Sequence, residues 1–284
     1  MKRYTIRDIQ KMKDEGQAIT MLTGYDATSA RLAEATDIPL ILVGDTLGMV
    51  VQGHDSTLPV TMAHMIYHAS IVTRVTEQAF VVGDMPFMSY HISPAQALEN
   101  AGRLMQEAGV SCVKLEGGAA RAETIAHIVN AGIPVMAHIG LTPQSVNLFG
   151  GFRVQGKQLD SARQLLRDAR AVQDAGAFAV VLELVPARLA QLITEQLHIP
   201  TIGIGAGAGC DGQVQVFHDI LALFDDFVPK HTKRYAEIGE MMRAALQQYR
   251  DDVQARQFPT DANSFSIQDE IIAQLEAEVA DESR

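Results

Sequence analysis

Short apolar runs alternate with amphipathic stretches along most of this sequence, and this alternation constrains the fold more than any other feature. Seven runs are rich in aliphatic residues and end in or near a polar residue: 18–26, 39–45, 79–86, 111–118, 134–140, 177–186 and 200–207. Continuous apolar runs of this length predict strands that are buried on both faces. Amphipathic patterns stand between them, and the segments 94–109 and 161–176 each end in a Gly, as helices commonly do.

Strands that alternate with helices predict parallel pairing, because a parallel neighbour is reached through a crossover connection. Helical patterns also cover 122–132, 187–198 and 234–250, and the segment 212–221 is the best candidate for an eighth strand. The chain of 284 residues exceeds the common domain size of about 150 residues, but an α/β barrel of this length forms a single domain. The sequence therefore predicts a (β/α)8 barrel, with a doubly wound open sheet as the alternative.

Composition and charge exclude several classes of protein. With 47% hydrophobic residues the chain can bury a full core, which excludes a disordered protein. The formal net charge is −11 and no run is rich in Lys and Arg, so no nucleic-acid partner is expected. Residues 251–284 contribute −7 of this charge, from nine acidic and two basic residues. We expect them to form a peripheral or mobile extension of one barrel domain over residues 1–250.

The cysteines and the first residues indicate the compartment. Cys112 and Cys210 are too few for a disulfide framework, which favours a reducing environment. The charged beginning of the chain lacks the apolar segment of a signal peptide, and no apolar stretch reaches the length of about 18 residues that a membrane span needs. We therefore expect a cytoplasmic protein with no membrane partner.

Ionisable residues stand at the ends of most predicted strands. They are Asp26, Asp45, Asp84, Glu116, His138 and Glu183. In a parallel barrel the carboxyl ends of all strands meet at one mouth, where the active sites of such barrels form. The segments 45–60 and 140–157 are long for connections and are expected to carry function there. A single acidic residue can instead cap the next helix, and Asp26, which precedes a helical pattern, fits that interpretation best.

Asp45, Asp84 and Glu116 together predict a divalent cation. Three carboxylates at one mouth repel each other and need a positive counter-charge. Oxygen ligands without a Cys or His cluster favour Mg²⁺ or Mn²⁺ over Zn²⁺. His64 and His68 stand four residues apart on a predicted helix, a spacing that zinc enzymes use. Without the Glu of the HExxH motif, an ordinary surface or interface pair is the better interpretation.

Lys114 precedes Glu116 by two residues, so both side chains lie on the same face of their strand and point into the barrel. Either a buried salt bridge or a cation that receives a substrate carboxylate explains an inward Lys, and we favour the second. Glu183 ends the apolar run AFAVVLELV and suits a general base, with a structural ion pair as the alternative. The glycine-rich segment 203–209 either binds an anion through its backbone amides or allows close packing.

Several long motifs resemble those of the ketopantoate hydroxymethyltransferase family. They are VGDTLGMVVQGHDSTLPVT at 43–61, GDMPFMSY at 83–90, VKLEGG at 113–118, AHIGLTPQSVNLFGG at 137–151, LELVP at 182–186 and IGIGAG at 202–207. The resemblance covers residues 4–250. It implies a TIM barrel of the phosphoenolpyruvate/pyruvate type that transfers a hydroxymethyl group from 5,10-methylenetetrahydrofolate to 3-methyl-2-oxobutanoate. The product, 2-dehydropantoate, serves pantothenate and coenzyme A biosynthesis, and the family implies one Mg²⁺ per subunit and a homodecamer.

The resemblance also implies roles for the metal and substrate residues. Asp45, Asp84 and Glu116 correspond to the carboxylates of the magnesium site. Asp45 with Thr46, and Asp84 with Lys114, correspond to contacts with the 2-oxo acid. Thr46 departs from the Ser that the family commonly has at this position, so the hydroxyl is kept and a methyl group is added.

Glu183 corresponds to the proton acceptor of the family, and His138 is expected as a polar wall of the same pocket. In the implied reaction the 2-oxo acid chelates Mg²⁺, which polarises the ketone and stabilises the enolate that forms when the adjacent carbon loses its proton. The enolate then attacks the methylene carbon of the folate, and water supplies the oxygen of the new hydroxyl group.

Two other functions remain open at this point. A Mg²⁺-dependent lyase or mutase of the isocitrate-lyase type would share the acidic strand ends. Such lyases carry a catalytic Cys in a loop near the middle of the chain, which neither Cys112, inside a predicted strand, nor Cys210, after the seventh strand, matches. A barrel that has lost catalysis and serves as a scaffold should lack a carboxylate or the Lys, and all of them are present.

Overall fold

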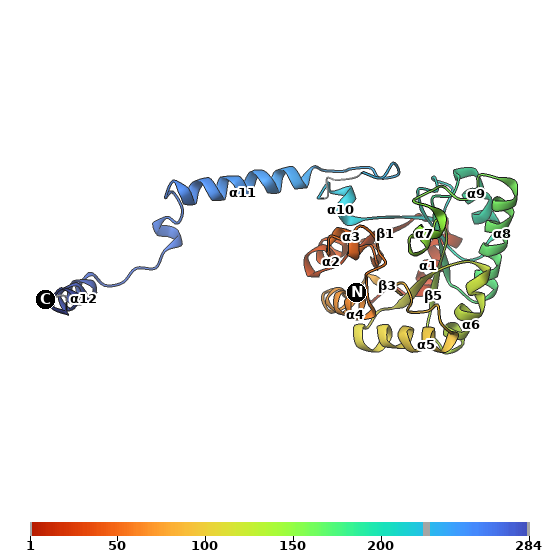
Figure 1. The fold of residues 1–284 in the computed structure, drawn as a ribbon, viewed down its shortest axis with the longest axis horizontal. Coiled ribbons are helices and arrows are strands. Elements are labelled where there is room, and N and C mark those ends of the chain that lie inside the picture. Colours follow the sequence, from red (N-terminus) through yellow and green to blue (C-terminus); the bar gives the residue numbers. More distant parts are fainter. Residues whose placement is uncertain (1, 224–227, 283–284) are drawn as a thin grey trace. The chain divides into compact units, whose positions relative to one another are not determined.

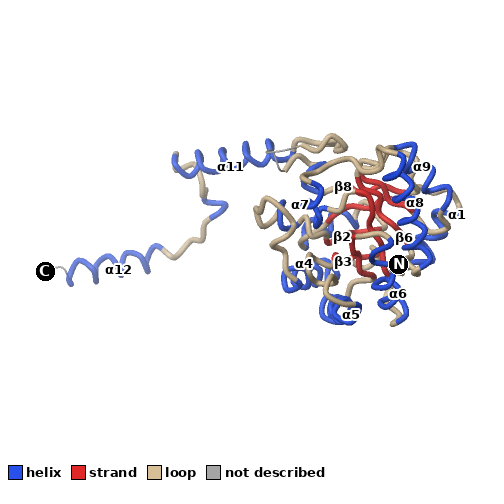
Figure 2. Tube along the Cα trace, turned by 45° about the vertical axis from the view of Figure 1, so that its right-hand side comes forward, coloured by secondary structure: helices blue, strands red, loops and turns tan. Residues whose placement is uncertain are grey.

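The computed structural model of this chain describes residues 2–223 and 228–282. The chain divides into two compact units, Met1–Ala236 and Glu237–Arg284. Strands occupy the centre of the first unit and helices lie around them (Figure 1 and Figure 2). Residue 1 of the predicted barrel domain (1–250) and residues 283–284 of the predicted extension (251–284) fall outside the described residues.

Eight parallel strands close into a barrel, in which each strand pairs with the next and β1 pairs with β8. The strands are β1 (Ile19–Thr23), β2 (Leu40–Val43), β3 (Phe80–Asp84), β4 (Cys112–Glu116), β5 (Val135–Gly140), β6 (Ala179–Glu183), β7 (Thr201–Ile204) and β8 (Gly212–Gln215). Every run predicted as a strand contains one. The predicted (β/α)8 barrel is confirmed, and the open sheet was the wrong alternative.

One helix, α1 (Ile6–Asp14), precedes the first strand, and the other helices of this unit follow strands and lie around the barrel. They are α2 (Ala27–Glu34), α3 (Leu47–Val50), α4 (Met62–Val75), α5 (Pro94–Arg103), α6 (Ala122–Asn130), α7 (Val146–Phe149), α8 (Leu159–Asp174), α9 (Ala187–Gln196) and α10 (Phe217–Ile220). Shorter pieces are the π-helical turn η1 (Leu104–Ala108) and the 3₁₀ turns η2 (Ala119–Arg121) and η3 (Pro143–Ser145). Gly109 and Gly176, which end two predicted helices, have φ of 70° and 94°, which Gly adopts without steric cost.

The last predicted strand, 212–221, is shorter than expected. β8 ends at Gln215, and α10 follows within the same segment. The backbone N–H of Phe217 donates to Thr23 Oγ1 at 2.9 Å, and Phe217 is buried in the core. The apolar character of this segment therefore reflects the burial of its helical part, and not a longer strand.

The barrel interior is closed at the amino ends of the strands. A hydrophobic cluster inside the barrel includes Ile9 and Met12 of α1 together with strand residues. The side chain of Gln10 on the same helix donates to the carbonyl of His198, which lies shortly before β7. Because α1 packs against this end, an open pocket on the barrel axis is expected only at the carboxyl ends.

Asp26 caps α2, as the sequence predicts. Its side chain accepts a hydrogen bond from the backbone N–H of Ser29 at 2.8 Å, and the Ser29 hydroxyl accepts one from the backbone N–H of Asp26 at 3.2 Å. The carboxylate therefore serves the start of the helix, where it also interacts favourably with the helix dipole.

The second unit consists of helices. They are α11 (Ile238–Gln254), the 3₁₀ turn η4 (Asp261–Asn263) and α12 (Asp269–Glu282). α11 corresponds to the helical pattern predicted over 234–250 and continues past residue 250. The division into a barrel domain over 1–250 and an extension over 251–284 stays a prediction. Several apolar side chains of α11, among them Met241 and Leu246, are exposed. Within the described part of the chain, none of the helices has the length and apolar character of a membrane span.

Gly140, at the end of β5, comes close to the end of β6, and we predict that replacing it destabilises the barrel. Its φ is 94°, and a Cβ there would collide with the backbone carbonyl of Glu183 and lie 2.8 Å from Val185 Cγ2. Gly140→Ala is expected to lower the free energy of unfolding by about 1–2 kcal/mol through backbone strain. Overpacking is expected to lower it by about 1–3 kcal/mol more, which urea denaturation measures.

Gly132→Ala is the matched control for this prediction. Gly132 has a φ of 88°, but no atom lies within 4 Å of the position that its Cβ would take. This variant should therefore show the loss from backbone strain alone. Equal losses in the two variants would contradict the steric argument, because Gly140 meets backbone atoms and Gly132 does not.

Candidate active site

A small pocket of about 50 Å³ opens at the carboxyl ends of the strands. The residues predicted for the site all line it: Asp45, Thr46, Asp84, Lys114, Glu116, His138 and Glu183. The rest of the lining is mostly neutral and includes Leu42, Val181, Ile204 and Val214. The fold thus gathers at one place seven side chains that the sequence spreads over five strand ends.

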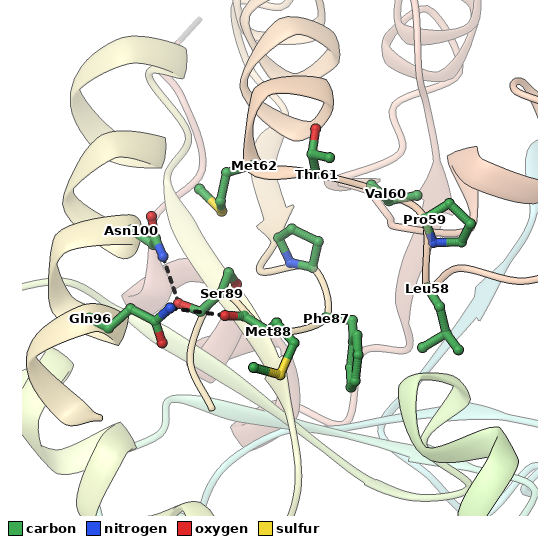
Figure 3. Close-up of a pocket in the computed structure, with 11 residues that line it drawn as sticks. Leu58, Pro59, Val60, Thr61, Met62, Phe87, Met88, Ser89, Gln96 and Asn100 are labelled. Atoms are coloured by element: carbon green, nitrogen blue, oxygen red, sulfur yellow. Dashed lines mark hydrogen bonds between the residues drawn. The ribbon is translucent and has the colours of Figure 1, made fainter. Parts of the chain in front are cut away.

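A larger pocket of about 460 Å³ lies beside the loop after β3 and α5 (Figure 3). Its lining is mainly apolar and includes Leu58, Val60, Met62, Phe87 and Met88. The side-chain amides of Gln96 and Asn100 donate to the carbonyl oxygens of Met88 and Ser89 at 3.0 and 2.7 Å and hold the loop (Figure 3). None of the seven predicted site residues lines this pocket. The ionisable groups belong to the smaller pocket.

Lys114 and Asp84 form a buried ion pair in the smaller pocket. The register of β3 and β4 places the two residues side by side, and Lys114 Nζ lies 2.7 Å from Asp84 Oδ1. Asp84 Oδ2 accepts a hydrogen bond from the backbone N–H of Asp45 at 3.0 Å. Burial alone lowers the pKa of Lys114, but the carboxylates around it, Asp84 foremost, raise the pKa by more. The ammonium group therefore stays charged.

Asp45 and Glu116 bring more negative charge than this ammonium group balances. Burial, and after it repulsion from Asp84, raises the pKa of Asp45 to about 7. Burial, and after it repulsion from Asp45, holds the pKa of Glu116 well above its usual range. With Glu183, four carboxyl groups line a pocket that also contains Lys114. A divalent cation fits this imbalance, because it would stabilise the ionised form of each carboxyl group.

The donor set of the pocket suits Mg²⁺ with additional oxygen ligands. Among residues 2–223 and 228–282, no group of three or more His, Cys, Asp or Glu side chains is arranged so that it could hold a metal ion, so water and substrate oxygens would have to supply ligands. Mg²⁺ commonly takes one or two carboxylates and completes its coordination with water and substrate oxygens. The pair His64 and His68 lies elsewhere, on α4, where His68 Nδ1 is 2.7 Å from the carbonyl oxygen of Tyr25.

His138 stands between Lys114 and Glu183. Its Nδ1 lies 3.4 Å from Lys114 Nζ, and its Nε2 lies 3.2 Å from Glu183 Oε2. Burial, and after it the charge of Lys114, lowers the pKa of His138, so that the ring is neutral at pH 7. Because an ammonium group can only donate, Nδ1 is the acceptor and the ring proton lies on Nε2, toward Glu183. The Glu183 side chain is 16% exposed, against 4% for Asp84.

Three neutral polar residues complete the site and were not predicted from the sequence: Tyr25, Tyr90 and Gln144. The Tyr25 hydroxyl lies 2.7 Å from Thr46 Oγ1. Gln144 Nε2 donates to Asp45 Oδ2 at 2.8 Å, and Gln144 Oε1 accepts from the Tyr90 hydroxyl at 2.6 Å. The one available signal was the length of the segment after the fifth strand, which contains Gln144.

The glycine-rich segment 203–209 packs closely against its neighbours. A Cβ at Gly205 would lie 2.6 Å from Leu184 Cδ2, and one at Gly209 would lie 2.7 Å from Gln191 Cβ. Gly205 also has a φ of 63°. These close approaches bring the segment after β7 against α9 and the end of β6, and they support the packing interpretation.

The metal-free protein is predicted to lose stability as the pH rises from about 4 to about 7. The pKa of Asp45 is raised from 3.8 to about 7 in the folded state. Between these values the folded state binds more protons than the unfolded state, so the free energy of unfolding falls with rising pH. Thermal unfolding in EDTA, compared between the wild type and Asp45→Asn, isolates this contribution. A wild-type Tm that rises relative to the variant over this range would contradict the prediction.

Comparisons with known proteins decide the family. A family model described as ketopantoate hydroxymethyltransferase matches residues 3–261. The chain belongs to this family. It is 61% identical over 257 residues to the 3-methyl-2-oxobutanoate hydroxymethyltransferase of Chloroflexus aurantiacus, a match that covers 90% of this chain and 91% of the relative. The prediction of a ketopantoate hydroxymethyltransferase, and therefore of a transferase enzyme, is confirmed. The family assignment disfavours the two alternatives, the lyase or mutase and the scaffold.

Solved structures share the fold of this ketopantoate hydroxymethyltransferase family member. A phosphoenolpyruvate phosphomutase from Streptomyces platensis subsp. rosaceus has a TM-score of 0.59 at 15% identity, and the match covers 99% of this chain and 98% of that one. A phosphonopyruvate hydrolase in complex with oxalate and Mg²⁺ has a TM-score of 0.56 at 14% identity, over 99% of both chains. These likenesses concern the fold alone, the closed parallel barrel of eight strands.

Proposed function

We propose that this chain transfers a hydroxymethyl group from 5,10-methylenetetrahydrofolate to 3-methyl-2-oxobutanoate, with 2-dehydropantoate as the product. One observation carries the proposal: four carboxyl groups, a charged Lys and a neutral His line one pocket at the strand ends of a member of this family. The reaction requires a base for the C3 proton, a positive charge for the substrate carboxylate and a Lewis acid at the ketone. The pocket contains a candidate for each requirement.

Lys114 is the proposed partner of the substrate carboxylate. Its ammonium group is held in place by Asp84 at 2.7 Å and remains charged. Thr46 is the proposed hydrogen-bond donor to the same molecule. Its Oγ1 lies 2.7 Å from the hydroxyl of Tyr25, which fixes the direction of the Thr46 side chain.

Asp45, Asp84 and Glu116 are the proposed residues that hold one Mg²⁺, together with water and substrate oxygens. When bound, Mg²⁺ would supply a Lewis acid for the ketone of the 2-oxo acid. The raised pKa values of Asp45 and Glu116 support this proposal, because both groups need a nearby cation to ionise fully at neutral pH.

Glu183 is the proposed general base. It lies at the edge of the carboxylate cluster, and its Oε2 lies 3.2 Å from Nε2 of His138. Glu183 accepts the C3 proton, and the electron pair that remains on the substrate forms a bond to the methylene carbon of the folate. Both bonds from that carbon to the folate nitrogens N5 and N10 break, and water supplies the hydroxyl oxygen. The C3 proton and one proton of the water balance the two nitrogens, which each end with one hydrogen in tetrahydrofolate.

Proton NMR of 3-methyl-2-oxobutanoate in D2O with the enzyme, Mg²⁺ and 5,10-methylenetetrahydrofolate tests the proposal, with EDTA as the control. We expect 2-dehydropantoate to form with Mg²⁺ and not with EDTA. Loss of the C3 proton signal without product would retain the base and reject the folate donor. No change in the substrate would reject the proposed reaction.

The subunits are proposed to assemble into a homodecamer, as the family resemblance implies. Exposed apolar side chains on α11 support assembly, because a partner would remove them from water. Sedimentation velocity of the full chain measures the number of subunits, and a monomer would reject this part of the proposal.

A further inference from the structure

Gln144 is a buried amide whose hydrogen-bonding groups are all occupied. It lies in η3, after β5, and is 5% exposed. Its Nε2 donates to Asp45 Oδ2 at 2.8 Å and to the carbonyl oxygen of Met85 at 3.0 Å. Its Oε1 accepts from the Tyr90 hydroxyl at 2.6 Å. With the amide reversed, Oε1 would face two acceptors, so the neighbours determine its orientation.

The backbone of Gln144 holds a second carboxylate of the cluster. Its N–H donates to Glu116 Oε2 at 3.0 Å. The backbone N–H of Glu116 in turn donates to the Tyr90 hydroxyl at 3.2 Å, and that hydroxyl donates to Gln144 Oε1. Gln144, Tyr90 and Glu116 therefore form a closed ring of hydrogen bonds, to which Asp45 is attached through Nε2.

Through these bonds Gln144 engages one oxygen of each carboxylate. Asp45 Oδ2 and Glu116 Oε2 are taken by Gln144, whereas Glu116 Oε1 lies 3.7 Å from His138 Nδ1, on the pocket side. Each N–H donor also stabilises the ionised carboxylate that it contacts. The amide thus determines the direction and favours the charge of two of the proposed metal carboxylates.

We propose that Gln144 is a positioning residue of the metal site, which orients Asp45 through its side chain and Glu116 through its backbone. The inference rests on the proposed function, since it takes the bound group to be a divalent cation. Gln144 does not touch the substrate in this proposal and acts through the carboxylates that it holds. Tyr90 assists by fixing which end of the amide faces Asp45.

Binding of Mn²⁺ to the substrate-free protein, measured by electron paramagnetic resonance of the free ion, tests this role. Gln144→Leu keeps the side-chain size similar and removes the donor, and it should weaken Mn²⁺ binding by about 10–100-fold, as the loss of a partner behind a metal ligand commonly does. Gln164→Leu is the control, because Gln164 donates to Asp168 Oδ1 at 3.0 Å on the exposed side of α8. It should leave Mn²⁺ affinity unchanged.

A second variant and a double mutant keep the test decisive. Tyr90→Phe removes the hydroxyl that orients the amide and accepts the backbone N–H of Glu116, so it should weaken Mn²⁺ binding in the same direction even if Gln144→Leu does not fold. In an Asp45→Asn background, Gln144→Leu should add less than it does in the wild type, because the two residues act through one contact. Unchanged Mn²⁺ affinity in a folded Gln144→Leu or in Tyr90→Phe would overturn the inference. A wild type that binds no Mn²⁺ would overturn the proposed metal site itself.

Discussion

Glu183→Gln is expected to slow exchange of the C3 proton of 3-methyl-2-oxobutanoate by about 10²–10⁴-fold, the contribution of a positioned general base. The amide has nearly the size of the carboxyl group and keeps an oxygen 3.2 Å from His138 Nε2, so the pocket should keep its shape. An amide cannot accept the proton. Deuterium exchange without folate, followed by NMR, measures this step alone, and calorimetry with the 2-oxo acid and Mg²⁺ should show unchanged binding.

Glu107→Gln is the control for this variant. Glu107 pairs with Arg103 at 2.8 Å on the surface, so its replacement removes a carboxylate without touching the pocket. Exchange should proceed there at the wild-type rate. If binding disappeared together with exchange in Glu183→Gln, Glu183 would be a ligand or a structural group and not the base.

Lys114→Met is expected to lower the free energy of unfolding by about 3–5 kcal/mol, which is typical when one partner of a buried ion pair is removed. The loss arises because Asp84 is left buried without its cation, beside Asp45 and Glu116, which already repel each other. Urea denaturation in EDTA measures this loss. Catalysis should be lost as well, because the proposed partner of the substrate carboxylate is gone.

Lys13→Met provides the comparison. Lys13 pairs with Asp211 at 2.8 Å, but this pair is 14% and 16% exposed and contains one carboxylate. Its loss should therefore cost clearly less stability than Lys114→Met. Mg²⁺ should restore part of the stability of Lys114→Met and none of that of Lys13→Met. Equal losses in EDTA would contradict a pocket in which the charge of Lys114 balances several carboxylates.

The sequence predicts the barrel and the ionisable part of the site for the same physical reason. Asp45, Asp84 and Glu183 stand where the apolar runs of β2, β3 and β6 end, and a closed parallel barrel brings such ends together. Lys114 and Glu116 follow from the period of two along a strand. In each case a local pattern together with the topology is sufficient to place the side chain at the pocket.

The neutral residues of the site depend on contacts that no local pattern contains. Gln144 meets Asp45 across 99 residues of sequence, and Tyr90 meets Gln144 across 54. An amide or a phenol has ordinary roles on any surface, so its type alone indicates nothing about a metal site. The residue at which β8 ends was also not predicted. Phe217 is buried as part of the short helix α10, and it gives the same apolar pattern in the sequence as a strand residue does.

The pocket has two unlike sides. Its ionisable residues come from the ends of five consecutive strands, β2 to β6, whereas β7 and β8 contribute Ile204 and Val214. A small molecule with a carboxylate at one end and a branched alkyl group at the other is therefore expected to bind in one orientation, with its carboxylate at the charged side and its alkyl group at the neutral side. The neutral side limits the length of the alkyl group. Substitutions at Ile204 or Val214 can then change the range of accepted 2-oxo acids while the charged side keeps its chemistry.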